Sequence, residues 1–409
     1  MSKWEVQICK LDQLGTVSRG RSRHRPRNDQ SLYGGEYPFI QTGDVKSANF
    51  YINKYSQTYN EKGLAQSKLW KKGTLCITIA ANIAETAILA IDACFPDSIV
   101  GFTPFKDKSD VRYVKYCFDT YKKEMQAMSL GATQDNFSVE KMLKVKFVVP
   151  QLPTQQKIAD ILSTYDDLIE NNNRRIELLE KAAENLYKEW FVRFRFPDYK
   201  KTKFENGLPK GWTVEKLGNV VDVTSSKRVY LSDYVEVGVP FYRSKEIIQL
   251  SNGQALSEIL YISQGKYLEF KNRFGVPQKN DILLTSVGTI GIPMLVRDDN
   301  PFYFKDGNLT WIKSSLNVEL AVYLYSWIKS DFGKQQLLSS SIGTSQSALT
   351  IENLKKIKVV LPGKEIIEKF NCLVNDIIYE VNNLQTQNRN LIKQRDLLLP
   401  RLMNGKLEI

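Results

Sequence analysis

The sequence has few of the residues that build catalytic and metal centres. It contains one histidine, His24, and five widely separated cysteines that form no Cys-x-x-Cys pair. This pattern argues against a zinc knuckle, a disulfide framework and most mechanisms that use imidazole as an acid or base. Scattered free thiols are typical of a reducing compartment, so we expect a cytoplasmic protein.

Longer signals are absent as well. No apolar run approaches the roughly 18–20 residues of a membrane span. The first ten residues, MSKWEVQICK, lack the apolar stretch of a signal peptide. No glycine-rich loop ends in Gly-Lys-Ser or Gly-Lys-Thr, so the chain itself is not expected to hydrolyse ATP. We therefore expect no membrane partner, no metal and no cofactor bound by this chain.

Positive charge is present in excess. The 409 residues include 57 Lys and Arg against 45 Asp and Glu, which gives a net charge of +12. This balance favours a polyanionic partner, with nucleic acid ahead of an anionic membrane surface. The hydrophobic content of 42% is typical of a globular protein, and the length is too great for one ordinary core.

The chain also repeats itself. Residues 131–150, GATQDNFSVEKMLKVKFVVP, and residues 343–362, GTSQSALTIENLKKIKVVLP, are identical at seven of twenty aligned positions. The parallel extends to KLDQLG and KLGNVV near the start of each half. Each half has short aliphatic and β-branched runs, a helical segment near 110–129 or 317–338, and a closing strand. The sequence therefore predicts two tandem α+β domains.

A heptad pattern follows each half. Apolar residues recur at 4-3 spacing from 158 to 190 and from 370 to 398, without Gly or Pro. This spacing predicts two long helices with apolar seams that a partner must cover. Pro400 is expected to end or kink the second helix. The predicted seam residues are Ile158, Leu162, Tyr165, Ile169, Ile176, Leu179, Leu186, Phe370, Val374, Ile377, Val381, Leu384, Leu391 and Leu398.

The two helices are expected to pair as an antiparallel coiled coil, because each follows an equivalent domain and a twofold-like arrangement would oppose them. The alternative is that each helix packs on its own domain. The chain ends, NGKLEI and KWEVQICKL, together resemble NGLPKGWTVEKL at the start of the second half, as in a circularly permuted repeat. We therefore expect neighbouring termini. The predicted parts are a first domain (1–150), a central helix (151–196), a linker with the second domain (197–362), and a C-terminal helix and tail (363–409).

Four segments carry a resemblance to a known family. They are VVPQLPTQQKIADILSTYDDLIENNNRRIELLEK at 148–181, LYKEWFVRFRFP at 186–197, GLPKGW at 207–212 and LIKQRDLLLPRLMNGKLEI at 391–409. In this order they are similar to the DNA-specificity subunits of type I restriction–modification systems, and the resemblance covers essentially the whole chain. One departure is PQLPTQQ at 150–156, where the family often has Pro-Pro-Leu-x-Glu-Gln.

The resemblance implies a non-catalytic reader of double-stranded DNA. Two target-recognition domains would each bind one half of a bipartite, asymmetric site, and the helices would set the spacer. Two modification subunits would dock on this scaffold and carry S-adenosylmethionine. Restriction subunits, with the motor and nuclease that use ATP and Mg²⁺, can join them. The complex would be an adenine-N6 DNA methyltransferase and an ATP-dependent endonuclease.

Other functions stay open at this point. The chain could be a stand-alone bipartite DNA-binding regulator, or the specificity subunit of a complex that only methylates. A fused enzyme that reads and modifies DNA would need motifs that the chain lacks, such as the Asn/Asp-Pro-Pro-aromatic tetrapeptide of adenine methyltransferases. Acidic residues of the helices, including Asp166 and Glu180, are expected to be solvated or to contact another subunit.

An arginine run is the first candidate DNA contact. RGRSRHRPR has arginines at alternate positions, which would point the same way if the segment is extended. They could face phosphates or guanine edges, or form a solvated, flexible charge run. The matching segment of the second half, SSKRVY at 225–230, keeps two cations, so the two halves are expected to read different bases. These candidates are Arg19, Arg21, Arg23, Arg25, Arg27, Lys227 and Arg228.

Polar residues in loops after strands form a second set. They could contact base edges or phosphates, or serve as ordinary turn residues. Gln134 and Gln346 occur in both halves, so they are expected to contact phosphate or to make a structural hydrogen bond. The other candidates are Gln41, Thr42, Lys46, Asn82, Arg243, Ser244, Lys245, Ser286 and Thr289.

Overall fold

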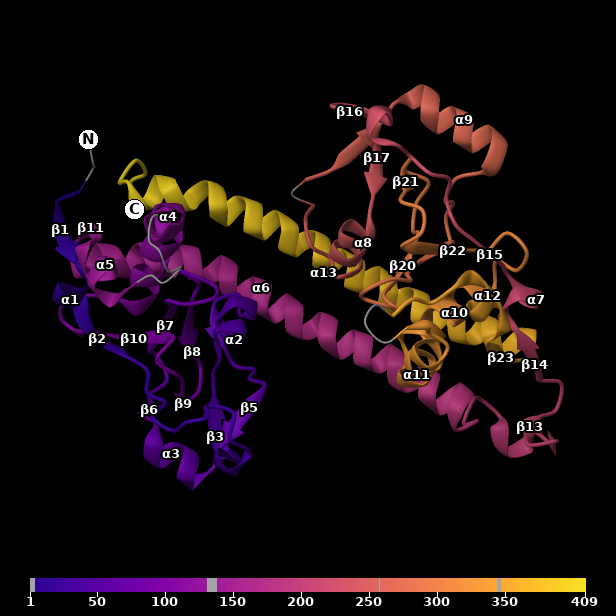
Figure 1. The fold of residues 1–409 in the computed structure, drawn as a ribbon, viewed down its shortest axis with the longest axis horizontal. Helices are drawn as coiled ribbons and strands as arrows, with labels where there is room; N and C mark the ends of the chain where they lie inside the picture. Colours follow the sequence, from indigo (N-terminus) through magenta and orange to yellow (C-terminus); the bar gives the residue numbers. More distant parts are fainter. Residues whose placement is uncertain (1–3, 131–137, 257, 344–346) are drawn as a thin grey trace. The chain divides into compact units, whose positions relative to one another are not determined.

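The chain divides into two compact units (Figure 1). The first is Met1–Asn171 with Asn390–Ile409, and the second is Asn172–Arg389. Each unit combines one α+β domain with part of both long helices, so the predicted fold class is confirmed. The computed structural model describes residues 4–130, 138–256, 258–343 and 347–409.

A five-stranded sheet lies at the centre of the first domain, in the order β2-β10-β7-β8-β4. Its neighbours are antiparallel except for the β4–β8 pair. Strands β7 and β8, with the sequences LCIT and TAIL, are buried at every residue, as expected for short apolar strands covered on both faces. The strands are β2 (Gly15–Arg19), β10 (Ile99–Pro104), β7 (Leu75–Thr78), β8 (Thr86–Leu89) and β4 (Tyr51–Ile52).

A four-stranded sheet completes this domain in the order β5-β3-β9-β6, and its β3–β9 pair is parallel. Its strands are β5 (Gln57–Tyr59), β3 (Tyr33–Phe39), β9 (Ala93–Cys94) and β6 (Leu69–Trp70). Strand β1 (Val6–Lys10) pairs separately with β11 (Lys146–Pro150). The helices are α1 (Leu11–Leu14), α2 (Thr42–Ser47), α3 (Glu61–Gln66), α4 (Val111–Leu130) and α5 (Val139–Lys144), with a 3-10 turn at Gln30–Leu32.

The second domain has two four-stranded sheets, in the orders β15-β22-β19-β20 and β16-β18-β17-β21. The first consists of β15 (Asp222–Thr224), β22 (Leu309–Lys313), β19 (Ile282–Thr285) and β20 (Pro293–Leu295). The second consists of β16 (Tyr234–Val235), β18 (Leu260–Ile262), β17 (Val239–Tyr242) and β21 (Tyr303–Phe304). The remaining strands are β14 (Thr213–Lys216), paired with β23 (Lys358–Leu361), and the hairpin of β12 (Phe204–Glu205) and β13 (Leu208–Pro209).

The helices of the second domain are short. They are α7 (Leu217–Val220), α8 (Ser244–Ser251), α9 (Gln264–Phe274), α10 (Leu320–Lys329), α11 (Asp331–Ser339) and α12 (Ile351–Lys356), with 3-10 turns at Tyr199–Lys201 and Leu231–Asp233.

The sequence repeat is a repeat of topology. The order β2-β10-β7-β8 in the first domain recurs as β15-β22-β19-β20 in the second, with antiparallel neighbours in both. The parallel β3–β9 pair recurs as β17–β21, and each has an antiparallel strand on its other side, β5 or β18. Loops at matching places in the two domains can therefore be compared directly.

Two long helices, α6 (Leu152–Tyr187) and α13 (Lys364–Met403), carry the heptad seams. A π-helical turn, Lys188–Val192, continues α6. Every predicted seam residue is buried or half-buried. Pro400, expected to end or kink the second helix, lies inside α13, in the last turn, so it does not end the helix. None of the described helices combines the length and apolar character needed to cross a membrane.

The helices run antiparallel inside each unit. In the first unit, Ile158 and Leu162 share a buried core with Leu402. Further along α6, Asp166 forms an ion pair with Arg395. Residue numbers on α13 thus fall as those on α6 rise.

The second unit continues the same order. Asn172 Nδ2 donates to Asn388 Oδ1 at 3.0 Å, in a polar layer of the seam. Beyond it, the rings of Phe191 and Phe370 pack with centroids 4.8 Å apart. The predicted antiparallel pairing is confirmed, and the alternative that each helix packs only on its own domain is wrong. The outer ends of the helices do contribute to the domain cores as well.

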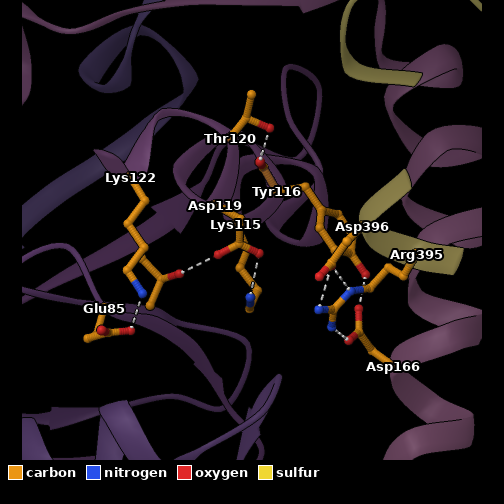
Figure 2. A network of polar contacts seen from close by, with 10 residues as sticks. Glu85, Lys115, Tyr116, Asp119, Thr120, Lys122, Asp166, Arg395 and Asp396 are labelled. Carbon is orange, nitrogen blue, oxygen red and sulfur yellow. Dashed lines mark hydrogen bonds and ion pairs between the residues drawn. The ribbon is translucent and has the colours of Figure 1, made fainter. Parts of the chain in front are cut away.

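A buried ion pair joins α6, α13 and α4 in the first unit (Figure 2). The Asp166 carboxylate is 1% exposed and accepts hydrogen bonds from Arg395 Nη1 and, at 2.5 Å, from the Tyr116 hydroxyl. Burial and the nearby Asp166 carboxylate raise the pKa of Tyr116 far above its ordinary value, so the phenol remains a donor. The expectation that Asp166 is solvated or contacts another subunit is therefore wrong, because side chains from two other helices enclose it.

Both ends of the chain pack on the core of the first unit. Trp4, Leu407 and Ile409 are partly buried against it. In the second unit, Trp212 takes the place that corresponds to Trp4 and packs on Phe196, with ring centroids 5.0 Å apart. This arrangement is the circularly permuted repeat that the sequence predicts.

Candidate nucleic-acid interface

The arginine run of the first domain lies in the loop after β2. Its backbone is fixed by neighbouring segments: Arg21 N–H donates to the Phe95 carbonyl at 3.0 Å, and Arg23 N–H donates to Gln66 Oε1 at 2.6 Å. His24 N–H shares that Gln66 oxygen at 3.0 Å. The loop is therefore anchored at several points, although its side chains are exposed.

The loop is not one extended strand. Only Arg19 lies in β2, and the chain bends between residues 24 and 28. At the bend, His24 Nε2 contacts Asp29 Oδ2 at 2.7 Å. Hydrogen bonds from Ser31, followed by the one from His24, lower the pKa of Asp29 to about 2. The condition under which all five arginines would point the same way, an extended segment, is therefore not met past residue 23.

The five arginines therefore have different surroundings. Arg19 Nε donates to the Asp97 carbonyl at 3.0 Å, and Arg27 Nη2 contacts Asp97 Oδ2 at 2.9 Å. Arg25 Nη1 donates to two main-chain carbonyls of its own loop at 2.8 Å. The guanidinium groups of Arg21 and Arg23 contact no acceptor within the described residues. All five side chains are exposed.

A polar pocket of about 280 Å³ lies beside this loop. Two predicted residues, Gln41 and Thr42 at the start of α2, line it together with Arg27. Gln57 also lines the pocket, and Gln41 Nε2 donates to Gln57 Oε1 at 2.6 Å. This hydrogen bond orients both side-chain amides. The Gln41 main-chain N–H donates to Asp44 Oδ2 at 2.8 Å and caps the short helix.

Lys46 and Asn82, two further predicted residues, meet each other. Lys46 Nζ on α2 donates to Asn82 Oδ1, in the loop between β7 and β8, at 3.0 Å. Lys46 is exposed and Asn82 is half-buried. This cation thus stands at an open surface of the first domain, oriented by the loop between β7 and β8.

The second domain presents fewer cations at the matching loop. Lys227 and Arg228 follow β15 and both are exposed. Lys227 Nζ lies 4.9 Å from the centroid of the Phe274 ring. Arg228 Nε contacts Asp306 Oδ2 at 3.1 Å. As the sequence predicts, the two domains offer different side chains at equivalent places.

The Arg243 side chain forms an ion pair with Glu246. Its Nε and Nη2 atoms contact the two carboxylate oxygens of Glu246 at 3.1 and 2.7 Å. Glu246 is 1% exposed and also accepts the Arg243 main-chain N–H at 2.8 Å. Burial raises the pKa of Glu246, but these hydrogen bonds from Arg243 lower it more. That Arg243 contacts DNA stays a prediction; its side chain is 36% exposed and its guanidinium already pairs with Glu246.

The remaining predicted residues of this domain differ in how far their side chains are exposed. Ser286 is buried and its hydroxyl meets Thr310 Oγ1 at 2.6 Å, so the prediction that it contacts DNA is wrong. Ser244 is half-buried and donates weakly to a carbonyl at 3.5 Å. Lys245 and Thr289 are exposed.

Several features escaped the sequence analysis. Asp97 and Asp306 hold arginines from distant loops, and Gln57 pairs with Gln41. Nothing local marks the two aspartates, because each acts through a partner about seventy residues away. The predicted Gln134 and Gln346 lie outside the described residues. Glu180 is not merely solvated, since it pairs with Lys329 at 2.6 Å.

Within the described residues, no group of three or more His, Cys, Asp or Glu side chains could hold a metal ion. The exposed cations and amides can donate hydrogen bonds to phosphate oxygens and base edges.

Known proteins share both the sequence and the fold. A family model described as the type I restriction modification DNA specificity domain matches residues 1–181 and again 209–393. The type I restriction enzyme MjaIX specificity subunit of Methanocaldococcus jannaschii is 27% identical over 420 residues, which cover 99% of this chain and 94% of that one. The HindI specificity subunit of Haemophilus influenzae is 24% identical over 484 residues, which cover all of both chains.

A solved structure agrees. The type I restriction-modification S subunit from M. genitalium matches with a TM-score of 0.58 at 16% identity, over 98% of this chain and 96% of that one. This likeness shows that the two chains share a fold. Because the family model matches both halves of the chain, the chain belongs to the family of type I restriction modification DNA specificity subunits.

Proposed function

We propose that this chain selects the DNA site of a type I restriction–modification complex. The observation that carries the proposal is the repeated loop after β2 and β15. It presents exposed cations at the same place in two domains of the same topology, but with different side chains. Exposed cations supply the phosphate contacts that dominate affinity for DNA. Different side chains at equivalent places suit a bipartite site with two different halves.

Not every predicted residue belongs to the proposed contact surface. Ser286 and Arg243 are left out, since the first is buried and the guanidinium of the second pairs with both carboxylate oxygens of Glu246. The surface keeps Arg19, Arg21, Arg23, Arg25, Arg27, Gln41, Thr42, Lys46, Asn82, Lys227, Arg228, Ser244, Lys245 and Thr289.

The long helices would also dock the modification subunits. Large apolar side chains lie exposed on them, outside the seam, where a partner surface could cover them. In the first unit they include Leu168 at 46% and Leu397 at 62% exposed, and in the second Leu178 at 59% and Tyr379 at 68%. Catalysis would belong to the partners, with S-adenosylmethionine on the modification subunits and ATP with Mg²⁺ on the restriction subunits.

Methylation in a reconstituted complex tests this proposal. The chain, purified with modification subunits and given S-adenosylmethionine, should direct N6-adenine methylation to one bipartite sequence, read by methylation sequencing. The control reaction omits this chain and should methylate no specific site. Methylation by this chain alone would contradict the non-catalytic role. Failure to bind modification subunits, together with repression of a promoter, would favour a stand-alone regulator.

Exchange of domains tests the modular part. Replacing residues 1–150 with the matching domain of another family member should change one half of the methylated sequence and leave the other. Replacing residues 197–362 is the matched control and should change only the other half. A simultaneous change of both halves would contradict one domain per half-site. Binding should also weaken with salt, by a log–log slope of about 0.9 for each neutralised phosphate.

A further inference from the structure

The same type of ion pair recurs in the two domains. In the first, Arg27 Nη2 contacts Asp97 Oδ2 at 2.9 Å. In the second, Arg228 Nε contacts Asp306 Oδ2 at 3.1 Å. Both arginines are well exposed, at 51% and 69% of the side chain, while their aspartates are more enclosed, at 34% and 20%.

The two pairs occupy equivalent places in the fold. Asp97 lies in the connection from β9 to β10, and Asp306 in the connection from β21 to β22. Each connection leaves the strand that pairs in parallel with β3 or β17 and enters the other sheet of its domain, at β10 or β22. Each arginine comes from the loop after β2 or β15, the edge strand that pairs with β10 or β22. The recurrence points to a shared role, because the surrounding loops otherwise differ in sequence.

Each of these arginines donates to its aspartate through only one of its nitrogens. Arginine has five N–H donors, so four on Arg27 and four on Arg228 have no acceptor among the described residues. Asp97 Oδ1 has no donor within the described residues, so no closed fork forms there. Arg243 is the contrast inside the same chain, because both oxygens of Glu246 engage it. A single contact with a carboxylate orients a guanidinium and leaves its other donors available to DNA. A guanidinium that binds both oxygens of one carboxylate has fewer donors left for DNA.

We propose that Arg27 and Arg228 each read a guanine, one in each half-site, and that Asp97 and Asp306 position them. This inference rests on the proposed function. On Arg228 the aspartate accepts the hydrogen bond of Nε–H and leaves both terminal NH₂ groups, which match the O6 and N7 acceptors of guanine in the major groove. On Arg27 the Nη1 group and the remaining Nη2 proton can make the same fork. A pre-oriented side chain loses less conformational freedom when it binds.

Selection from a pool of randomised DNA duplexes tests the assignment. The full chain with its modification subunits is compared with Arg27→Lys and Arg228→Lys, which keep the charge but not the fork. Each variant should lose a guanine preference of about 5- to 150-fold at one position of one half-site, and leave the other half-site unchanged. Replacing that guanine with 7-deazaguanine, which lacks the N7 acceptor, should weaken the unmodified chain but not the matching lysine variant.

The positioning role has its own readout. Asp97→Asn should lower the guanine preference in the same half-site as Arg27→Lys, while it raises affinity for non-specific DNA because a negative charge is lost. A residue with only a structural role would not move these two quantities in opposite directions. Thermal melting of each variant checks that it is folded. Arg23→Ala is the matched control: it should weaken binding to all duplexes alike and reduce the salt slope by about one.

The outcomes separate this inference from the proposed function. If the unmodified complex selects no sequence, DNA recognition by this chain is wrong, and the assignment falls with it. If it selects a bipartite site but Arg27→Lys and Arg228→Lys select the same site with undiminished guanine preference, only the assignment is wrong. Loss of preference in both half-sites from one substitution would also overturn it.

Discussion

Replacing Arg395 with methionine should strongly destabilise the first unit. The substitution keeps the length of the side chain and removes the cation that faces Asp166, which is 1% exposed (Figure 2). Only the Tyr116 hydroxyl, at 2.5 Å, would then contact that carboxylate among the described residues. Breaking a buried pair by removing one partner costs about 3–5 kcal/mol, because the remaining charge stays desolvated.

The size of the effect can be checked within the same network. Tyr116→Phe removes one hydrogen bond to a charged group and should cost about 1.5–3 kcal/mol. Removing both charges, in Arg395→Met with Asp166→Leu, should recover most of the loss, because a buried pair replaced by apolar residues is often neutral or stabilising. The non-additivity of the double variant is the signature of the pair.

Urea unfolding and thermal melting provide the assay. For a unit of this size, each kcal/mol lowers Tm by about 2–4 °C, so Arg395→Met should lower it by roughly 6–20 °C. Arg401→Met is the matched control, because it removes the same charge from an exposed position of α13; its effect should stay within about 0.5 kcal/mol. If Arg395→Met costs less than about 1 kcal/mol, the reasoning from burial and pairing is refuted.

Three further predictions follow from single contacts. Asn172→Leu should cost about 1–3 kcal/mol in urea unfolding because Asn388 loses a buried partner, and adding Asn388→Leu should restore stability; an equal loss in both variants would contradict this. N-ethylmaleimide should modify the exposed Cys372 well before Cys76, whose thiol pKa burial raises; equal rates by mass spectrometry would argue against that burial. The pKa of Glu246 is lowered from its ordinary value of 4.5, so its contribution to stability is present above pH 4.5 and is lost as the pH falls below that value. Glu246→Gln should therefore reduce the loss of stability at acid pH. An unchanged dependence of stability on pH would contradict this role of Glu246.

The predictions that succeeded rest on local periodicity. The heptad spacing identifies α6 and α13 because each seam residue must lie on one face of its helix, whatever the rest of the chain does. The antiparallel pairing and the neighbouring termini follow from the repeat, since equivalent domains place equivalent helices. Asn172 and Asn388 interrupt the seams at positions that the pattern also marks, and they meet each other in the structure.

The predictions that failed depend on partners distant in sequence. Ser286 follows a strand, as a loop residue should, yet Thr310 on the neighbouring strand β22 meets it and buries it. Asp166 looks like a solvated helix charge until α13 and α4 enclose it. Burial and pairing of this kind arise only when separate elements pack.

The two repeated α+β domains, the two long helices and the excess of positive charge can all be read from the sequence. Repeats, periodicity and charge can be recognised without knowing which distant residues meet. Which cations are held by an aspartate and which have no partner among the described residues depends instead on how separate elements pack. Arg27 is oriented by Asp97 and Arg228 by Asp306, and each pair exists because a crossover between two sheets brings an aspartate beneath an arginine from a distant loop.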